Sequence, residues 1–578
     1  MPGDADFIQK VVHMLEAGKM AVWVKGALAV VAIATLGVYH LYYFPGLATA
    51  QAMDQAQIGR HIASLHGWKT NVIRPRALGQ LVANHKKLQS MVYDTYEAPL
   101  PPFADAIALR VVKSHWKMTM RDPVYIGDKA IAAEAIVLFL GSILVLYHLA
   151  RRLFDRRLAL IACGLVLLCD LFWQYSLSGL PQMLMLLLFN GTLYALVRAI
   201  EADKVNGPVE RWLAVAGAGF GFLALSHALT LWILAGAIIF LAIYFRSRIW
   251  LPAIVLAVAA VLYSPWLLRN FVITGNPGGV AIYSVFDGIV HSEAGHMRRM
   301  ANDLGVGLVA AFRDKMIANF SKEIGTLVSN FGWSVVALMF FPGLLHRFKR
   351  PETGAVRWLV LAMWLGAMLG MSVYGVTSEQ GVAANELNVL FVPIMICFGL
   401  AFLFVLWNRL NFKFPFARLA FVIGLYLICA LPMIFNLPAF APASRRSIRW
   451  PPYLPPYISV LNDWMQPNEI IASDMPWAVA WYADRRSVWL PDTVEKFTEF
   501  NDYGTLGGPV NGIYLTPVSG TENKMGDIIK GEYKEWARFI LHNVDLQKSP
   551  LKWVAMLGVE DECVFYADHD RRKDVPNQ

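Results

Sequence analysis

The sequence predicts a multi-pass α-helical membrane protein with about eleven transmembrane helices. It also predicts amphipathic helices in the first external loop and a small external α/β domain at the C-terminus. Composition is the first observation behind this fold class: 57% of the 578 residues are hydrophobic, only 16% are charged, and the mean hydropathy is +0.46. Soluble domains carry about 25% charged residues, so an ordinary soluble fold is excluded. The other two observations are the spacing of the apolar segments and the charge of the loops between them.

The predicted spans are apolar segments close to the length of about 20 residues that a helix needs to cross a bilayer. The first is expected to be a retained signal anchor, because no cleavage pattern follows its apolar run. The two segments on either side of His227 also allow a different division. The spans are expected at residues 21–43, 129–149, 158–173, 180–199, 212–226, 230–245, 251–268, 332–345, 358–374, 387–407 and 416–435.

The loop charges set the expected orientation. If the N-terminus lies in the cytoplasm, every short cytoplasmic connection is basic, whereas the short loops on the other side contain no Lys or Arg. The positive-inside rule therefore predicts a cytoplasmic N-terminus and, with an odd number of spans, an extracytoplasmic C-terminal segment in a bacterial-type inner (plasma) membrane. These loops also account for the net charge of +9, which indicates no nucleic-acid partner. The basic connections are 151–157, 198–211, 245–248, 346–357 and 408–418, and the loops without Lys or Arg are 173–179, 226–230 and 375–384.

The expected domain organisation is a transmembrane domain over residues 1–436, followed by an extracytoplasmic α/β domain over residues 437–578. The first domain carries external loops at 44–128 and at about 270–331. In the second, strands alternate with helices and a hairpin or two edge strands come last. Its simplest interpretation is a cap or packing module. Its strands are expected at 468–474, 487–491, 512–517 and within 553–568, and its helices at 476–485 and 530–541.

The first external loop is too long for a simple connector, and loops of this length are often functional. Two helices are expected in it, at 52–68 and 101–116, each with apolar residues at helical spacing on one side. Asp54 stands near the start of the first helix, where its carboxylate would lie close to the lipid headgroups. Cations in this loop need a partner, and an anionic headgroup is the simplest one. The charged residues between the helices include Arg74, Arg76, Lys86, Asp94 and Glu97.

Five stretches follow one another along the chain. They are MDQAQIGRHIASLHGW (53–68), YEAPLPPFADAIALRVV (96–112), SGLPQMLMLLLF (178–189), SPWLLRNFVITGNPGG (264–279) and SDMPWAVAWYADRRSVWLP (473–491). In content, order and topology they resemble the GT-C integral-membrane glycosyltransferases, close to the protein mannosyltransferase and aminoarabinose-transferase branch. Each stretch is degenerate alone, so the order is the specific part. One position departs from the family: Gln182 stands where many relatives carry an acid.

The resemblance implies an inverting glycosyltransferase that moves a sugar from a polyprenyl-phosphate donor to an extracytoplasmic lipid, glycan or protein acceptor. Transfer needs a base for the acceptor proton and cations for the departing phosphate. The resemblance gives Asp54 the role of base or of the acid that orients acceptor or metal, and Glu97 that of a second catalytic acid. A divalent cation, Mg²⁺ or Mn²⁺, is left open, and membrane lipids are expected partners. The residues expected to bind substrate are Arg60, Arg74, Arg76, Lys86, Asp94, Arg269, His291 and His296.

Other interpretations of these residues stay open. Asp54 can be a solvated acid at a helix start, and Glu97 can form a surface salt bridge. A solvated basic face accounts for the loop arginines, and a snorkelling side chain accounts for Arg269. The His–Glu–His set within 291–296 invites a zinc interpretation, but two His five residues apart share a helix face poorly and no third ligand is spaced nearby.

Two other functions are consistent with a multi-pass topology. A transporter or flippase of a lipid-linked or small substrate keeps ionisable residues within its spans. In this chain the spans hold few charges, and the acids cluster in external loops. A receptor or assembly protein would bind a partner through its loops and would need no acid at Asp54.

Overall fold

A computed structural model of the chain divides it into two compact units, Met1–Pro45 and Gly46–Gln578. In the first unit, helix α2 spans Lys19–Tyr42 and includes most of the first expected span. All further elements belong to the second unit. The residues that the structure describes are 19–47, 49–83, 92–113, 116–289, 296–300, 307–379, 381–410, 416–436, 455–491, 493–502, 506, 508–516, 533–541, 543–544, 550–557 and 563–574.

Most of the expected spans are single apolar helices. Within the described ranges, seven helices are long and apolar enough to cross a membrane. The count becomes eight if α7 (Arg156–Leu167) and α8 (Asp170–Ser178), which are bent by 55° at their junction, form one span. The seven are α6 (Ile126–Leu153), α9 (Gln182–Lys204), α10 (Val209–Ser226), α12 (Trp250–Thr274), α17 (Pro351–Tyr374), α18 (Asn388–Arg409) and α19 (Ala417–Asn436).

At the other three expected positions the apolar helix is short or broken. The apolar part of α2 and helix α11 (Thr230–Tyr244) are shorter than a span. The segment expected at 332–345 divides into α15 (Val335–Leu338) and α16 (Phe340–Gly343), after a short α14 (Leu327–Asn330). Gly332 and Trp333 precede α15 with positive φ angles of 62° and 58°, which no continuous helix allows. The prediction of a multi-pass helical protein is confirmed, whereas the count of eleven is not.

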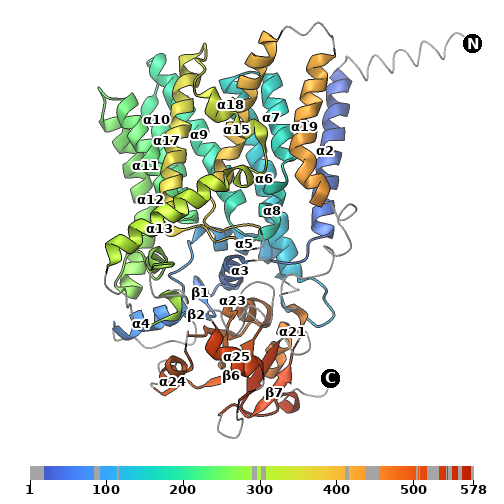
Figure 1. Ribbon diagram of the computed structural model, residues 1–578, viewed down its shortest axis with the longest axis vertical. Coiled ribbons are helices and arrows are strands. Elements are labelled where there is room, and N and C mark those ends of the chain that lie inside the picture. The colour runs from blue at the N-terminus through green and yellow to red at the C-terminus, as the bar shows by residue number, and fades with distance from the viewer. Residues whose placement is uncertain are drawn as a thin grey trace, which may run out of the picture. The chain divides into compact units, whose positions relative to one another are not determined.

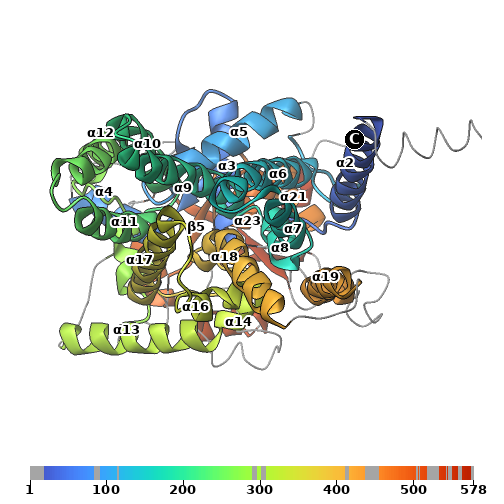
Figure 2. The same ribbon diagram turned by 90° about the horizontal axis from the view of Figure 1, so that it is seen from above.

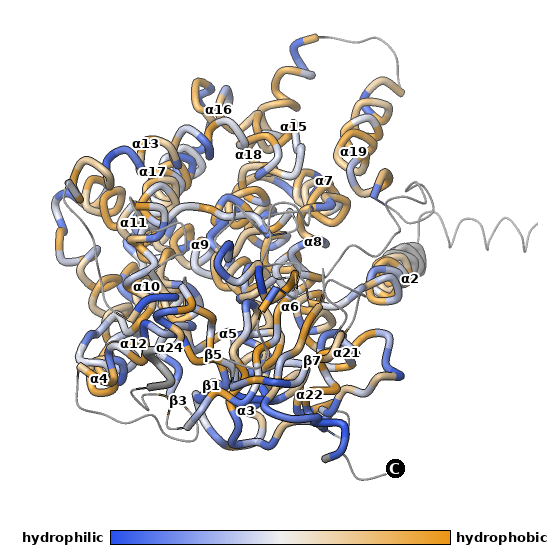
Figure 3. Tube along the Cα trace, turned by 60° about the horizontal axis from the view of Figure 1, so that its bottom comes forward, coloured by the Kyte–Doolittle hydropathy of each residue, from blue (hydrophilic) through white to orange (hydrophobic). Residues whose placement is uncertain are grey.

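The spanning helices of the second unit stand side by side, with the strands at one end of them (Figure 1). Helix α9 packs against α6 and α10, α10 packs against α12, and α11 packs against α17. Helix α13 (Leu308–Gly325) lies crosswise along the edge of this group (Figure 2). It exposes Val309, Ile317 and Phe320, as a helix at a membrane surface does. Hydrophobic residues dominate α18 and α19 in the hydropathy view (Figure 3).

The segment expected as the first external loop, residues 44–128 and called the first loop below, forms three helices of eight or more residues before α6 in its described part: α3 (Ala50–Ala63), α4 (Pro75–Ala83) and α5 (Leu100–Val111). Helix α5 exposes an apolar stripe of Phe103, Ile107 and Val111, spaced four residues apart, as expected of an interfacial helix. Helix α3 instead is buried along nearly its whole length, because α5 and the C-terminal part of the chain cover it. The expectation that α3 rests one apolar face on the membrane is therefore wrong, and Leu65 lies exposed beyond its end.

Helices α3 and α5 pack closely at Gly59. A Cβ atom at this position would lie 2.9 Å from Cβ of Asp105 and 3.0 Å from the carbonyl oxygen of Pro102. We expect Gly59→Val to lower the free energy of unfolding by about 1–3 kcal/mol, since both atoms would have to move with helix α5. Thermal melts of the purified protein in detergent check this. Gly191→Val, at a glycine with open space around it, is the control, and an equal loss in both variants would contradict the packing argument.

The strands form a six-stranded mixed sheet with the order β2-β5-β4-β6-β8-β7 and a separate two-stranded ribbon of β1 and β3. Strands β2, β5, β4 and β6 run parallel, and β6, β8 and β7 are antiparallel neighbours. Their bounds are β1 Lys69–Thr70, β2 Val72–Ile73, β3 Val92–Tyr93, β4 Ile470–Ser473, β5 Arg486–Trp489, β6 Val510–Leu515, β7 Trp553–Met556 and β8 Val564–Ala567.

Strand β2 belongs to the first external loop, yet it pairs with β5 near the other end of the chain, with Val72 opposite Ser487. Residues 455–574, where described, are called the C-terminal module below. Its hydrophobic core includes Ile73 and Leu78 of the first loop beside Ile470, Val488 and other module residues. The loop and the module therefore share one core.

The expected strands and the terminal hairpin of the module are confirmed as β4, β5, β6 and β7–β8. The helix expected at 476–485 is α23 (Pro476–Ala478) continued by the π-helical turn η4 (Val479–Ala483). The helix expected at 530–541 is shorter, with a 3₁₀ turn η7 (Lys534–Trp536) and α25 (Ala537–Ile540). The C-terminal module also contains the short helices α21 (Pro455–Ser459), α22 (Leu461–Trp464) and α24 (Val494–Asp502). The domain division at 436/437 stays a prediction.

Candidate functional site

Three short elements of the first loop bring its charged residues together. Strand β2 ends directly before Arg74, and strand β3 ends directly before Asp94. The ribbon pairing of β3 with β1 places Asp94 on the same side of the loop as Arg74, and both lie against the face of α3 that carries Asp54. We call Asp54, Arg74, Asp94 and Glu97 the acid–arginine cluster. All four residues are buried.

Asp54, only 2% exposed, has both carboxylate oxygens occupied. Oδ2 accepts a hydrogen bond from Nη2 of Arg74, and Oδ1 accepts one from Nε2 of Gln57 at 3.0 Å. Gln57 is itself held by the hydroxyl of Thr70 at 2.6 Å and by the backbone N–H of Asn71. The predicted catalytic acid is therefore fixed in one orientation, with an arginine as its counter-ion.

Arg74 connects Asp54 to the second acid. Its Nη1 lies 3.7 Å from Oδ1 of Asp94, and its guanidinium lies flat over the ring of Tyr96, with Cζ 3.9 Å from the ring centre. Planar arginine favours this combination of paired carboxylates and an aromatic face. Burial alone lowers the pKa of Arg74, but the charges of Asp54 and Asp94 raise it, so the side chain stays charged.

Asp94 and Glu97 form a tight turn before α5. Oδ2 of Asp94 accepts hydrogen bonds from the backbone N–H groups of Tyr96 at 3.2 Å and Glu97 at 2.8 Å, as turn aspartates do. Oε2 of Glu97 accepts from Nε2 of Gln51 at 3.1 Å and of Gln55 at 3.0 Å, both on α3. Oε1 of Glu97 is buried and has no hydrogen-bond partner among the residues that the structure describes. Glu97 is thus the member of the cluster with a free acceptor.

The cluster holds more negative than positive charge. Burial, followed by the charge of Asp54, raises the pKa of Asp94 to about 6 and raises the pKa of Glu97 well above its ordinary value. Arg74 opposes both effects. Carboxyl groups whose pKa values are raised toward neutrality are suited to exchange protons at physiological pH.

The raised pKa of Asp94 makes stability depend on pH. Its pKa is about 6 in the folded chain against 3.8 ordinarily, so the folded protein keeps a proton that the unfolded chain releases. This contribution to stability is complete below pH 4 and is lost as the pH rises to 6. We expect Asp94 alone to contribute a fall of roughly 2–3 kcal/mol in the free energy of unfolding over this interval, so the fall in Asp94→Asn should be smaller than that of the wild type by this amount. Thermal melts of both proteins between pH 4 and 7 check this; identical pH profiles would contradict it.

The C-terminal end of α12 closes one side of the cluster. Nη1 of Arg269 donates to the carbonyl oxygen of Asp94 at 2.8 Å, and Nη2 donates to that of Trp68 at 3.2 Å. The guanidinium also lies over the ring of Trp266 at 4.4 Å. Arg269 therefore lies beside the acids, and its guanidinium donates to backbone carbonyls rather than to a carboxylate. Its expected role in substrate binding stays a prediction.

Arg60, on the same helix as Asp54, joins the helix to the C-terminal module. Nη1 donates to the carbonyl oxygen of Trp481 at 2.8 Å. Nη2 donates to the carbonyl oxygen of Ala480 and to Oδ1 of Asp484, both at 2.8 Å. Asp128 at the start of α6 holds the same turn, accepting from Nε1 of Trp481 at 2.7 Å. The structure thus gives Arg60 protein partners, and its expected role in substrate binding stays a prediction.

We expect Arg60→Ala to loosen the module from α3. The variant leaves two buried carbonyls and a carboxylate without their charged donor, and each such hydrogen bond contributes about 1.5–3 kcal/mol. Faster amide hydrogen exchange in residues 479–484 is the measurement. Arg110→Ala, at an exposed arginine of α5, is the control. Unchanged exchange in the Arg60 variant would show that the module is held by other contacts.

The other predicted site residues lie apart or outside the described part of the chain. Arg76 donates to the carbonyl oxygen of Met300 at 2.9 Å and lies over the ring of Tyr283, away from the acids. Gln182 donates to the carbonyl oxygens of Ala383 and Ala384. Lys86 and His291 lie outside the described residues, and the backbone of His296 begins the 3₁₀ turn η3 (His296–Arg298).

Several residues of the site were not expected from the sequence. Gln51, Gln55 and Gln57 supply donors to the carboxylates, and Tyr96 supplies the ring under Arg74. Gln51 and Gln55 are four residues apart, a spacing that places both side chains on one face of a helix. That spacing was a usable indication that α3 presents amide groups to a carboxylate.

No group of three or more His, Cys, Asp or Glu residues in the described ranges could hold a metal ion. In the acid–arginine cluster, Arg74 and Gln57 already occupy the oxygens of Asp54. Asp54 therefore has no carboxylate oxygen left for a divalent cation while Arg74 and Gln57 hold it.

Comparison with known proteins agrees with the motifs. The family model of dolichyl-phosphate-mannose-protein mannosyltransferases matches residues 126–268. The oligosaccharyltransferase of Archaeoglobus fulgidus, solved with zinc and sulfate, is similar with a TM-score of 0.54 and 15% identity, over 88% of this chain and 70% of that chain. No curated protein sequence matches the chain significantly.

ArnT from Cupriavidus metallidurans is similar over 96% of this chain and 100% of its own in the apo state, with 13% identity and a TM-score of 0.53. The structure of the same protein bound to undecaprenyl phosphate is similar over 96% of this chain and 99% of its own, with 13% identity and a TM-score of 0.51. The resemblance to GT-C glycosyltransferases is thereby confirmed, and the likeness to these structures shows a shared fold.

Proposed function

We propose that this chain is a membrane glycosyltransferase that moves a sugar from a polyprenyl-phosphate donor to an extracytoplasmic lipid, glycan or protein acceptor. The observation that carries the proposal is the buried acid–arginine cluster, at the end of the spanning helices and beside Arg269. The fold supports it, since ArnT with the same fold has been solved with undecaprenyl phosphate bound.

In the proposed reaction an acceptor hydroxyl or amine attacks C1 of the sugar. The bond from C1 to the acceptor forms as the bond from C1 to the phosphate oxygen breaks, and the phosphate keeps the electron pair. The acceptor proton goes to Asp54. A single displacement of this kind inverts the configuration at C1, which is the stereochemical outcome we propose.

Arg74 links donor binding to the availability of the base. Without donor, its guanidinium neutralises Asp54 and lies close to Asp94. A donor phosphate competes for the same fork of donors, because arginine binds phosphate and carboxylate in the same bidentate way. Transfer of the guanidinium to the phosphate would leave Asp54 free to accept the proton, and Arg269 would add a second cation near the phosphate.

Glu97 is proposed to hold the acceptor. Its Oε1 is the buried cluster oxygen without a partner, so an acceptor hydroxyl or amine can donate a hydrogen bond to it. Oε2 stays fixed by Gln51 and Gln55, which prevents the side chain from turning away. We derive no step through a divalent cation, because Asp54 has no carboxylate oxygen left for one.

The proposal is tested with the purified full-length chain in nanodiscs. Radiolabelled undecaprenyl-phosphate sugars, mannose among them, are incubated with membrane lipids, peptides and glycans as acceptors, in Mg²⁺, Mn²⁺ or EDTA. Labelled product that forms with the wild type is the expected result. Uptake or translocation of a labelled lipid-linked sugar without any transfer would instead favour a transporter or flippase and overturn the proposal.

A further inference from the structure

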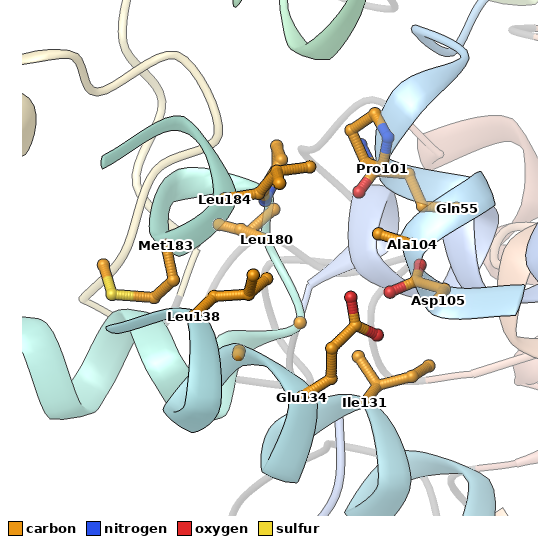
Figure 4. Close-up of a pocket in the computed structure, with 13 residues that line it drawn as sticks. Gln55, Pro101, Ala104, Asp105, Ile131, Glu134, Leu138, Leu180, Met183 and Leu184 are labelled. Carbon is orange, nitrogen blue, oxygen red and sulfur yellow. The ribbon is translucent and has the colours of Figure 1, made fainter. Parts of the chain in front are cut away.

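A second pair of acids lies next to the cluster but outside it. Asp105 of α5 and Glu134 of α6 turn their carboxyl groups toward each other across a small cavity (Figure 4). Asp105 is only 8% exposed, and Oε2 of Glu134 is buried without a hydrogen-bond partner among the described residues. Burial and the neighbouring Glu134 raise the pKa of Asp105 well above its ordinary value.

A third acceptor lines the same cavity. Gln55 is 1% exposed, and its Nε2 donates to the carboxylate of Glu97. Oε2 of Glu97 accepts from Nε2 of both Gln51 and Gln55, and in this orientation Oε1 of Gln55 is left buried without a partner among the described residues. Two carboxyl groups and one amide oxygen thus surround a cavity of about 20 Å³, which is room for one water-sized group.

The arrangement of acceptors restricts the occupant. A single proton shared between Asp105 and Glu134 would satisfy the carboxyl groups but not Gln55. Calcium or magnesium needs about six to eight oxygen ligands, and the remaining side chains of the wall are apolar. A primary ammonium group has three donors and one positive charge, which matches three acceptors and a negative site.

The mouth of the cavity indicates where such an ammonium comes from. Ala104, Leu138 and Leu184 of the wall are partly accessible, and Val137 and Ile107 beside them are exposed apolar side chains that face lipid in a spanning protein. Glu134 lies eight residues into α6, about 12 Å along the helix from its start. In a spanning helix that begins at the lipid surface, this depth lies close to the boundary between headgroups and acyl chains.

We infer that Asp105, Glu134 and Gln55 form a binding site for the primary ammonium group of a membrane lipid, of the phosphatidylethanolamine type. The site stands independently of the proposed sugar transfer. The site does, however, include Gln55, whose Nε2 donates to Glu97 of the acid–arginine cluster. An ammonium bound to Oε1 of Gln55 would therefore hold this amide in the orientation that contacts Glu97.

The test is native mass spectrometry of the delipidated full-length protein with four lipids of identical acyl chains. These are phosphatidylethanolamine, its N-methyl and N,N-dimethyl forms, and phosphatidylcholine. All carry the positive charge, but they have three, two, one and no N–H donors. Binding is expected to fall stepwise, by about tenfold or more in total. Equal binding of the first and last lipids overturns the inference.

Substitutions at the acids test whether the preference for phosphatidylethanolamine arises at this site. A single and a double variant are used, so the test does not depend on the folding of one protein. The isosteric Glu134→Gln, and Asp105→Asn combined with it, are expected to bring phosphatidylethanolamine to the level of phosphatidylcholine. Asp122→Asn, at a half-buried acid that accepts hydrogen bonds from Thr119, is the matched control and should keep the preference. A preference that survives the double variant overturns the site, and competition by free ethanolamine at the lipid's own concentration overturns the lipid as its source.

Discussion

Replacing Asp54 with asparagine is expected to reduce sugar transfer by about 10³-fold, since a positioned general base contributes 10²–10⁴-fold. The substitution keeps the size of the side chain and its hydrogen bond from Gln57, so the fold of α3 is preserved. Binding of undecaprenyl phosphate should stay the same or become tighter, because the guanidinium of Arg74 loses the carboxylate that competes with phosphate.

The two measurements separate catalysis from binding. Initial rates of transfer report on the base, and a thermal shift with undecaprenyl phosphate reports on the phosphate site. Asp122→Asn is the control for a charge change in the same loop and should transfer at the wild-type rate. If Asp54→Asn retains wild-type rates, the base is another group, and Glu97 is then the first to examine.

Replacing Arg74 with methionine is expected to lower the free energy of unfolding by about 3–5 kcal/mol, because removal of one partner leaves buried charges uncompensated. The substitution leaves the carboxyl groups of Asp54, Asp94 and Glu97 close together without the guanidinium that neutralises them. Part of the loss should return in the double variant Arg74→Met with Asp54→Asn, in which one stranded carboxylate is neutral.

Thermal melts in detergent measure this loss, and Arg110→Met provides the matched control at an exposed arginine of α5. Arg74→Lys keeps the charge but loses the fork and the stacking on Tyr96, so it should recover stability in part and transfer little. A methionine variant as stable as the wild type would mean that the acids are protonated when the cation is absent.

The sequence predicted that the first loop gathers the reacting groups, and Asp54, Arg74, Asp94 and Glu97 do lie together. The prediction was possible because acids and cations in a long external loop need partners. The sequence did not predict which acid would pair with which cation. Arg74 was expected to bind substrate through the donor phosphate. In the structure it forms an ion pair with Asp54, because a buried carboxylate without a cation is strongly destabilising.

The elements that sequence reasoning missed have no local pattern. A strand of two residues, Val72 and Ile73, shows no alternation, and its partner lies in the C-terminal module. The burial of α3 likewise depends on α5 and the module, which cover it from two sides. The break at Gly332 was visible as a glycine, but its positive φ and its close approach to Cys169 belong to the tertiary structure and have no pattern in the sequence.

The pairing of β2 with β5 has a consequence for biosynthesis. A ribosome that has made the first loop and most of the transmembrane helices has not yet made Ser487, the residue that lies opposite Val72. The segment that ends at Arg74 can therefore be held in register only after the module has been synthesised and has folded. We expect the acid–arginine cluster of a nascent or truncated polypeptide to stay unformed until about the last hundred residues are in place, so the proposed activity would begin only when synthesis is nearly complete.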